Sequence, residues 1–172
     1  MEDIWNITAL VVSVLSVLLS LYALRQATTK NTSDMYLFFI SQYAKEDMKL
    51  ALRKLKDIKR GVYRLEQWES DMKNNLPKAF EYDEARRLVK YFYDTLAYMK
   101  LEKLIEARFV RLICLKKGAW LYLDTVEAME KFFDSGYDKK PYAVIRDVCE
   151  NLRKEGCCPP SVSYTHLRAH ET

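Results

Sequence analysis

Hydrophobic residues recur at helical spacing along most of the chain, and no run alternates at period two. Residues 45–60, for example, place one apolar stripe on a single helix face: Met48, Ala51, Leu52, Leu55 and Ile58. Similar patterns predict further helices over 34–43, 62–73, 82–100, 106–116, 119–134 and 141–154. Short loops between such helices favour antiparallel neighbours. The pattern therefore predicts an all-α domain, a compact bundle of about five to six helices.

Glycine and proline positions set the expected helix ends. The four glycines all lie where one of these helices would stop: Gly61, Gly118, Gly136 and Gly156. Pro77 interrupts the chain between two helices, and Pro141 suits the first turn of the last one.

A different pattern precedes the domain. Residues 4–24 (IWNITALVVSVLSVLLSLYAL) contain no charged side chain in 21 positions. As a helix they would be about 30 Å long, which matches the hydrocarbon core of a bilayer. An acidic start (Glu2, Asp3) and Arg25 directly after the run argue against a cleaved signal peptide. We expect an uncleaved transmembrane helix that continues as a stalk into the domain.

Positive charges predict the orientation of this single-pass anchor. No lysine or arginine precedes the run, whereas Arg25, Lys30 and many others follow it. The positive-inside rule then places the N-terminus outside and the domain in the cytoplasm, at a bacterial inner membrane. The expected organisation is 1–32 anchor and stalk, 33–156 helical domain, 157–160 a truncated native segment and 161–172 a non-native tail. Ser16 and Ser20 form a small-residue pair within the run that would permit weak self-association, although tolerated serines explain it as well.

Three stretches carry a family resemblance: FFISQYAKEDMKLALRKL, ARRLVKYFYDTLAYMKLEKLIEARFV and AWLYLDTVEAMEKF. Together with the N-terminal apolar run they resemble an uncharacterised family of small bacterial single-span proteins, known only as a domain of unknown function. The resemblance covers about residues 36–133. It implies the same architecture, and it transfers no catalytic residue because the family has none established.

One helix is strongly basic. Residues 45–64 contain eight lysines and arginines against three acids. The candidate contacts to an anionic surface are Arg53, Lys54, Lys56, Lys59, Arg60 and Arg64. A solvated helix face explains the same charges and is the favoured interpretation. Lipid head groups come next, and nucleic acid is the least favoured partner because no recognised binding motif accompanies the charge.

The remaining candidates for chemistry are weak. Cys149, Cys157 and Cys158 lack the paired spacing of a zinc site. Cys149 fits the apolar stripe of the last helix, where cysteine behaves as a small hydrophobe. The acids Glu81, Asp83 and Glu84 suit a helix start. No phosphate-binding loop or nucleophile motif is present. We therefore nominate no catalytic residue, no metal ligand and no cofactor.

The C-terminal residues 162–172 (VSYTHLRAHET) resemble a translation of the transposase adapter used in sequencing libraries. They hold both histidines of the chain, His166 and His170, at a spacing that on a helix could bind a metal. If this tail is an artefact, the native chain has no histidine, which weakens the case for an enzyme.

The sequence thus predicts a membrane-anchored cytosolic interaction module. Its expected partners are the bilayer, through residues 4–24, anionic head groups and an unidentified protein. The alternative is a membrane-tethered effector that binds nucleic acid or nucleotides through the basic helix 45–64.

Overall fold

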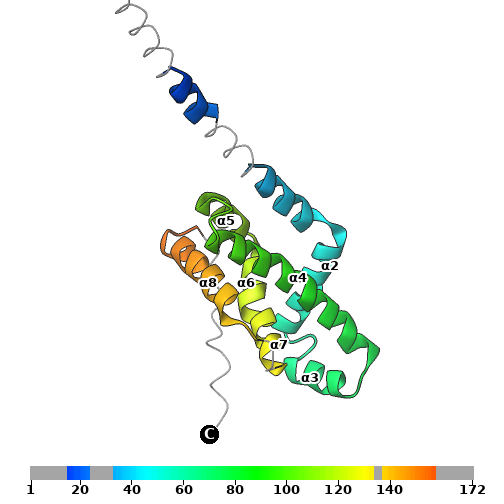
Figure 1. Cartoon of the computed structure of the whole chain (residues 1–172). Helices are drawn as coiled ribbons and strands as arrows, with labels where there is room; N and C mark the ends of the chain where they lie inside the picture. The colour runs from blue at the N-terminus through cyan, green and yellow to red at the C-terminus, as the bar shows by residue number, and fades with distance from the viewer. Residues whose placement is uncertain (1–14, 24–32, 134–136, 158–172) are drawn as a thin grey trace, which may run out of the picture. The chain divides into compact units, whose positions relative to one another are not determined.

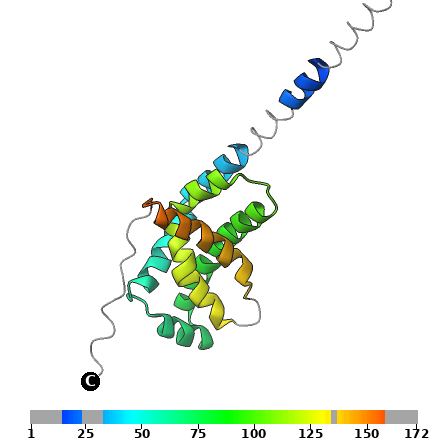
Figure 2. The ribbon, with the colours of Figure 1, turned by 90° about the vertical axis from the view of Figure 1, so that its left-hand side faces the viewer.

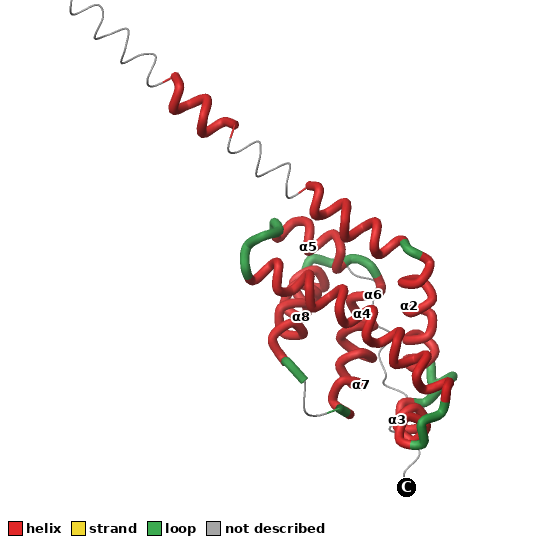
Figure 3. Tube along the Cα trace, turned by 45° about the vertical axis from the view of Figure 1, so that its right-hand side comes forward, coloured by secondary structure: helices red, strands yellow, loops and turns green. Residues whose placement is uncertain are grey.

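The computed structural model describes residues 15–23, 33–133 and 137–157. All regular structure in these ranges is helical, which confirms the all-α prediction (Figure 3). The chain divides into two compact units, Met1–Ser41 and Gln42–Thr172. Within the described residues, helix occupies 15–23 and 33–44, and the remaining helices belong to the second unit, which we call the helical domain.

The helical domain begins with three helices: α2 (Glu46–Lys59), α3 (Leu65–Lys73) and α4 (Pro77–Leu101). Helix α2 buries four of the five residues of its predicted apolar stripe, Met48, Ala51, Leu55 and Ile58, whereas Leu52 is half-buried. Gly61 follows α2 with a φ of 73°, as expected for a residue that ends a helix. Helix α4 starts earlier than predicted because Pro77 occupies its first turn, where a missing N–H costs nothing.

Four further segments follow α4: α5 (Ala107–Cys114), α6 (Lys117–Leu121), the π-helical turn η1 (Tyr122–Val126) and α7 (Glu127–Phe132). The last three run on without a break, since the residues at both junctions have α-helical dihedrals. Helix α8 (Lys139–Lys154) follows, with Pro141 in its first turn as predicted. Counting α6, η1 and α7 as one rod, the described part of the domain holds six helical rods.

Helix α4 lies at the centre of the domain. It packs against α2 on one side and against η1 and α8 on the other (Figure 1). Its side chains Val89, Tyr93 and Leu96 are fully buried. Trp68 of α3 is also fully buried, and its indole N–H donates to the Ala79 carbonyl at 3.2 Å. Burying side chains of this size contributes about 1.5–3 kcal/mol each, so this core dominates the stability of the domain.

Helices α3 and α5 lie at opposite ends of the domain (Figure 2). Helix α2 leads from the start of the domain towards α3. Helix α5 begins at the other end of α4, after a five-residue connection, and its C-terminus leads into α6.

Two sequence expectations about the core were wrong. Gly118 does not end a helix but lies inside α6, buried. A Cβ there would come within 2.8 Å of the Tyr93 hydroxyl, so close packing is the reason for glycine at this position. Leu88, which the helical spacing of the predicted helix 82–100 places in its apolar stripe, is 38% exposed.

Candidate functional site: a buried polar network on α4

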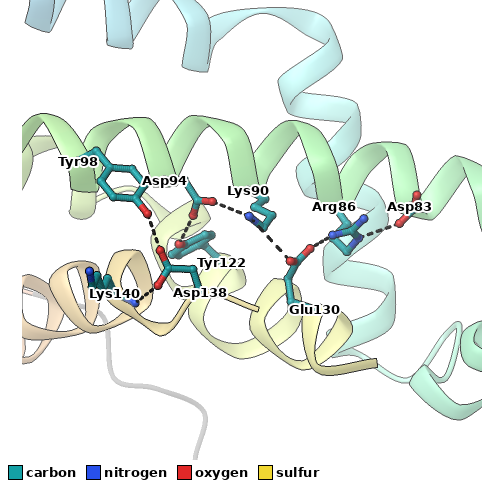
Figure 4. Close-up of polar contacts among 9 residues, drawn as sticks. All are labelled: Asp83, Arg86, Lys90, Asp94, Tyr98, Tyr122, Glu130, Asp138 and Lys140. Carbon is teal, nitrogen blue, oxygen red and sulfur yellow. Dashed lines mark hydrogen bonds and ion pairs between the residues drawn. The ribbon is translucent and has the colours of Figure 1, made fainter. Parts of the chain in front are cut away.

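Helix α4 carries charged residues at helical spacing on its inward side: Asp83, Arg86, Lys90 and Asp94. Intervals of three and four residues bring them onto one face. This face lies against α7 and η1 (Figure 4). Asp83 and Arg86 are 6% and 7% exposed, so their charges are removed from water. Buried charges require partners, and the network shows where these partners come from.

Arg86 is the centre of the network. Its Nε donates to Asp83 Oδ1 at 2.7 Å, and its Nη1 contacts Glu130 Oε1 of α7. The guanidinium also lies 4.7 Å from the centroid of the Phe133 ring, a cation–π contact. Glu130 is itself buried, at 6% exposure. Arg86 therefore joins α4 to α7 through a buried ion pair.

Lys90 extends the ion pairs along α4. Its Nζ lies 2.7 Å from Asp94 Oδ2 and 3.8 Å from Glu130 Oε2. Arg87, largely exposed, supplies a further cation to Asp83 at 3.1 Å. Three carboxylates thus face three cations, and the network carries no net charge.

Tyrosines close the other end of the network. The Tyr122 hydroxyl, from η1, donates to Asp94 Oδ1 at 2.5 Å. Burial, followed by this hydrogen bond, raises the pKa of Tyr122 well above its ordinary value. Its ring stacks on Tyr142 of α8, with centroids 4.5 Å apart and planes 9° apart. At neutral pH Tyr122 is therefore a protonated hydrogen-bond donor.

The N-terminus of α8 is held by the same face of α4. Tyr98 donates to Asp138 Oδ2 at 2.5 Å, and Asp138 Oδ1 accepts the backbone N–H of Lys140 at 2.9 Å. Asp138 is thus the N-cap of α8. These two hydrogen bonds, the one from Tyr98 first, lower the pKa of Asp138.

A third buried carboxylate, Glu127, links α7 to α8. It is 6% exposed and pairs with Arg146 of α8, and it accepts a hydrogen bond from Tyr137. Lys131 lies 3.6 Å from the same carboxylate. Burial and the bond to Glu127 raise the pKa of Tyr137 to about 12.

These groups suit holding helices together better than transferring protons. Each carboxylate of the network accepts from a cation or a phenol, and the phenols are donors at neutral pH. A general base needs a free acceptor within reach of a substrate proton. Paired buried charges instead specify one packing arrangement, because misplacing either partner leaves a charge buried alone.

The structure separates the six basic residues singled out in the sequence. Arg53 pairs with Glu46 at 3.0 Å, Lys54 with Glu81 at 3.0 Å, and Lys59 with Asp124 at 2.5 Å. Lys59 therefore also ties α2 to η1. The other three are exposed and have no ion pair among the described residues: Lys56, Arg60 and Arg64.

The cysteine that contacts Cys149 in the fold is Cys114, although Cys157 lies closer to Cys149 in the sequence. Cys149 is fully buried, as its apolar stripe predicts, and its neighbour is Cys114 of α5. A hydrogen bond from the Cys114 thiol lowers the pKa of Cys149. Cys157 is exposed, whereas Cys158, the tail 161–172 and both histidines lie outside the described residues. The described ranges contain no group of three metal-ligating side chains.

Sequence reasoning missed the network, although its signal was present. Asp83 was assigned to a helix start, but Pro77 begins the helix and places Asp83 in its second turn, where it is buried. The i, i+3, i+4 spacing of opposite charges at 83, 86, 90 and 94 could have revealed a charged stripe. The apolar stripe on the same helix obscured it.

Comparison with known proteins adds no relative: no family model matches the chain, and no curated protein or solved structure is detectably similar to it.

Proposed function

We propose that this protein is a single-pass membrane protein whose helical domain is an interaction module held at the inner leaflet of a bacterial membrane. The uncharged run 4–24 supplies the anchor, and the lysines and arginines after it favour a cytoplasmic domain. The family of single-span proteins that the chain resembles has the same proposed architecture.

The exposed apolar helix 15–23 is the observation that carries this proposal. All nine of its residues are exposed, yet six of them are large apolar side chains that are 53–67% exposed: Leu15, Val17, Leu18, Leu19, Leu21 and Tyr22. A helix that is apolar all round requires an apolar environment. The Ser20 hydroxyl donates to the Ser16 carbonyl at 2.8 Å, so this polar group is satisfied within the helix.

Within the described ranges, no helix has both the length and the apolarity needed to cross a bilayer. The proposed span 4–24 lies largely outside those ranges, and only residues 15–23 and their helical structure belong to them.

An interaction role suits the domain better than catalysis. The buried network on α4 is paired internally, so it fixes helix positions and presents no free acid or base. Tethering at the membrane raises the effective concentration of the domain towards partners in or on the same membrane. Weak self-association through the anchor remains part of the proposal.

Membrane fractionation tests the anchor. We expect the full chain, expressed in bacteria, to stay in the membrane pellet after alkaline carbonate washing. Replacing Leu15 and Leu18 by aspartate should release it, because each aspartate near the centre of a span costs about 2.5–3.5 kcal/mol. The matched control is Leu50→Asp, at an exposed leucine of the helical domain, which should remain in the pellet. Release of the unaltered chain would contradict the proposal.

The alternative, a tethered effector that binds nucleic acid through 45–64, rests on three exposed cations that have no carboxylate partner in the part of the chain that the structure describes: Lys56, Arg60 and Arg64. Their reversal to glutamate should abolish RNA or DNA binding if this alternative holds. Reversal of Lys54 and Lys59 is a poorer test, because both already pair with acids of α4 and η1.

A further inference from the structure

Residues 101–117 of the helical domain expose several large apolar side chains. This stretch runs from the last residue of α4 through α5 to the first residue of α6. All of its leucines are exposed, between 38% and 56%: Leu101, Leu104, Leu112 and Leu115. Its other large aliphatic residues, Ile105, Val110 and Ile113, are buried. Core packing therefore accounts for the isoleucines and the valine and leaves the leucines unexplained.

Positive charges accompany these leucines. Lys103, Lys116 and Lys117 are exposed and have no ion pair among the described residues. The two arginines of the stretch are paired instead, Arg108 with Glu106 and Arg111 with Glu155. Exposed leucines beside free lysines form the combination that binds the head-group region of an anionic bilayer.

The position of this surface in the domain also fits a membrane partner. The Tyr43 hydroxyl accepts the backbone N–H of Gly118 at 3.2 Å. The end of the stretch therefore lies beside the first residues of the domain, which the chain reaches from the proposed anchor. Arg60 and Arg64 lie beyond the other end of α2, towards α3 (Figure 1). These two exposed arginines are thus remote from the contact between Tyr43 and Gly118.

We propose that residues 101–117 are a second membrane contact, in which Leu101, Leu104, Leu112 and Leu115 enter the head-group region and Lys103, Lys116 and Lys117 bind anionic lipid. This inference rests on the proposed function, since the anchor brings the surface to the bilayer. Residues 25–42 connect the proposed span to Tyr43 and extend over at most about 60 Å, which keeps the surface within reach of the leaflet.

A nitroxide depth measurement tests the contact. In the full chain, Cys157 and Cys158 are changed to serine, and one nitroxide label is attached at Leu112→Cys. The control carries the label at Gln67→Cys, an exposed position of α3. Cys114 and Cys149 are fully buried and do not take up the label. Each protein is reconstituted into phosphatidylcholine vesicles with or without phosphatidylserine. We expect the label at 112 to collide mainly with oxygen in the anionic vesicles, and the label at 67 to collide with a water-soluble nickel complex in both.

Charge reversal identifies the residues responsible. K103E/K116E/K117E should return the label at 112 to water and lower the docking equilibrium on the order of a hundredfold, about fivefold for each lysine. K56E/R60E/R64E, at the end of α2 and in the connection to α3, makes the same change in net charge and should leave docking intact. If the α2 variant abolishes docking and the 101–117 variant does not, the proposal is wrong and α2 is the lipid-binding surface.

Flotation of the same vesicles separates this inference from the anchor. Protein that floats after alkaline washing while the label at 112 stays in water, with or without phosphatidylserine, overturns the second contact and leaves the anchor in place. The same result would follow if the leucines served a protein partner instead. Protein that does not float overturns both proposals.

Discussion

Helices α2 and α4 both carry many charged residues at helical spacing, yet the two sets lie in opposite environments. On α2 the cations are exposed or half-buried, and four of them pair with a single carboxylate, as Lys54 does with Glu81. On α4, Arg86 is 7% exposed and lies between Asp83 and Glu130, which are equally buried. The helix with the more conspicuous charge in the sequence therefore has the weaker interactions.

The difference in strength between the two sets of ion pairs follows from the hydration that each charge keeps or loses in the folded domain. An exposed ion pair exchanges good hydration for a screened attraction, and the net gain is about 0–1 kcal/mol. A buried ion pair has lost its hydration already, so removing one member leaves the other charge without either water or partner. Charge count along a helix therefore says little about which residues the fold depends on. Burial and pairing decide it.

The largest expected effect is the loss of Arg86. Arg86→Ala leaves Asp83 and Glu130 without their shared cation and should lower the free energy of unfolding by about 3–5 kcal/mol. Urea unfolding of the full chain in detergent, followed by circular dichroism, measures it. The neighbouring Arg87→Ala is the control, because the Arg87 side chain is 61% exposed and should contribute about 1 kcal/mol or less. Equal effects of the two substitutions would show that the network is not buried in solution.

The next largest effect should be a loss of stability at alkaline pH, which arises from the buried tyrosines Tyr93 and Tyr122. The pKa values of Tyr93 and Tyr122 are raised by burial above the ordinary 10.0. Each stabilises the fold fully below pH 10.0, and that stability is lost as the pH rises further, because only the unfolded chain can ionise. Each should lower the free energy of unfolding by about 1.4 kcal/mol per pH unit above this point. Helix α2 contains no tyrosine and contributes nothing to this slope.

Tyr122→Phe supplies the check on that slope. It should remove the share of one tyrosine, about 1.4 kcal/mol per pH unit, while it lowers stability at neutral pH through the lost hydrogen bond to Asp94. The tyrosinate absorbance that belongs to Tyr93 and Tyr122 should appear only together with unfolding. Ionisation of all tyrosines in a still-folded domain would contradict the assignment.

A smaller effect is expected where α2 and α4 meet α6. Gly118→Ala places a Cβ 2.8 Å from the Tyr93 hydroxyl of α4 and 3.1 Å from Leu52 of α2. Overpacking costs about 1–3 kcal/mol, and the better helix propensity of alanine returns about 1 kcal/mol. Thermal unfolding should show a net loss of about 1 kcal/mol. Adding Tyr93→Phe removes the closest atom, the Tyr93 hydroxyl, and should restore most of the lost stability. A double variant that is no more stable than Gly118→Ala would show that the strain arises from another contact.

The smallest effect should come from α2. A double-mutant cycle on Lys54 and Glu81 should give a coupling free energy of about 0.2–1 kcal/mol that falls with added salt. The coupling free energy from the corresponding cycle on Arg86 and Glu130 should be several times larger and should depend less on salt. Similar values for both pairs would remove the contrast between the two helices.

The sequence predicts the helices well because each depends mainly on local spacing. Four of the five predicted stripe residues of α2 are buried, Pro141 lies in the first turn of α8, and Cys149 is buried. Local signals also mislead where a neighbour decides. The sequence places Gly118 at a helix end. In the structure a side chain is excluded there by the hydroxyl of Tyr93, which lies 25 residues earlier in the chain.

The polar network could be predicted only in part. The helical spacing of the charges on α4 is visible in the sequence. The partners Glu130, Tyr122 and Asp138, which bind polar side chains of α4, come from segments that reach this helix only in the folded domain. The exposed leucines of 101–117 have the same limitation, since Leu112 fits a core stripe by spacing and yet is 42% exposed. The domain boundary at residue 33, the membrane span and the family resemblance remain predictions.

The π-helical turn η1 is the place where this helix can absorb a change in its length. A π turn accommodates one residue more than an α-helical turn, and such turns are often found at functional positions. Deleting Asp124 would let α6 and α7 join as a regular helix and would leave Glu127 and Glu130 on the faces that they occupy now. Deleting Ala128 from the α-helical part instead would rotate Glu130 by about 100° away from Arg86. The same one-residue deletion would therefore spare the buried ion pair at one position and remove it four residues later.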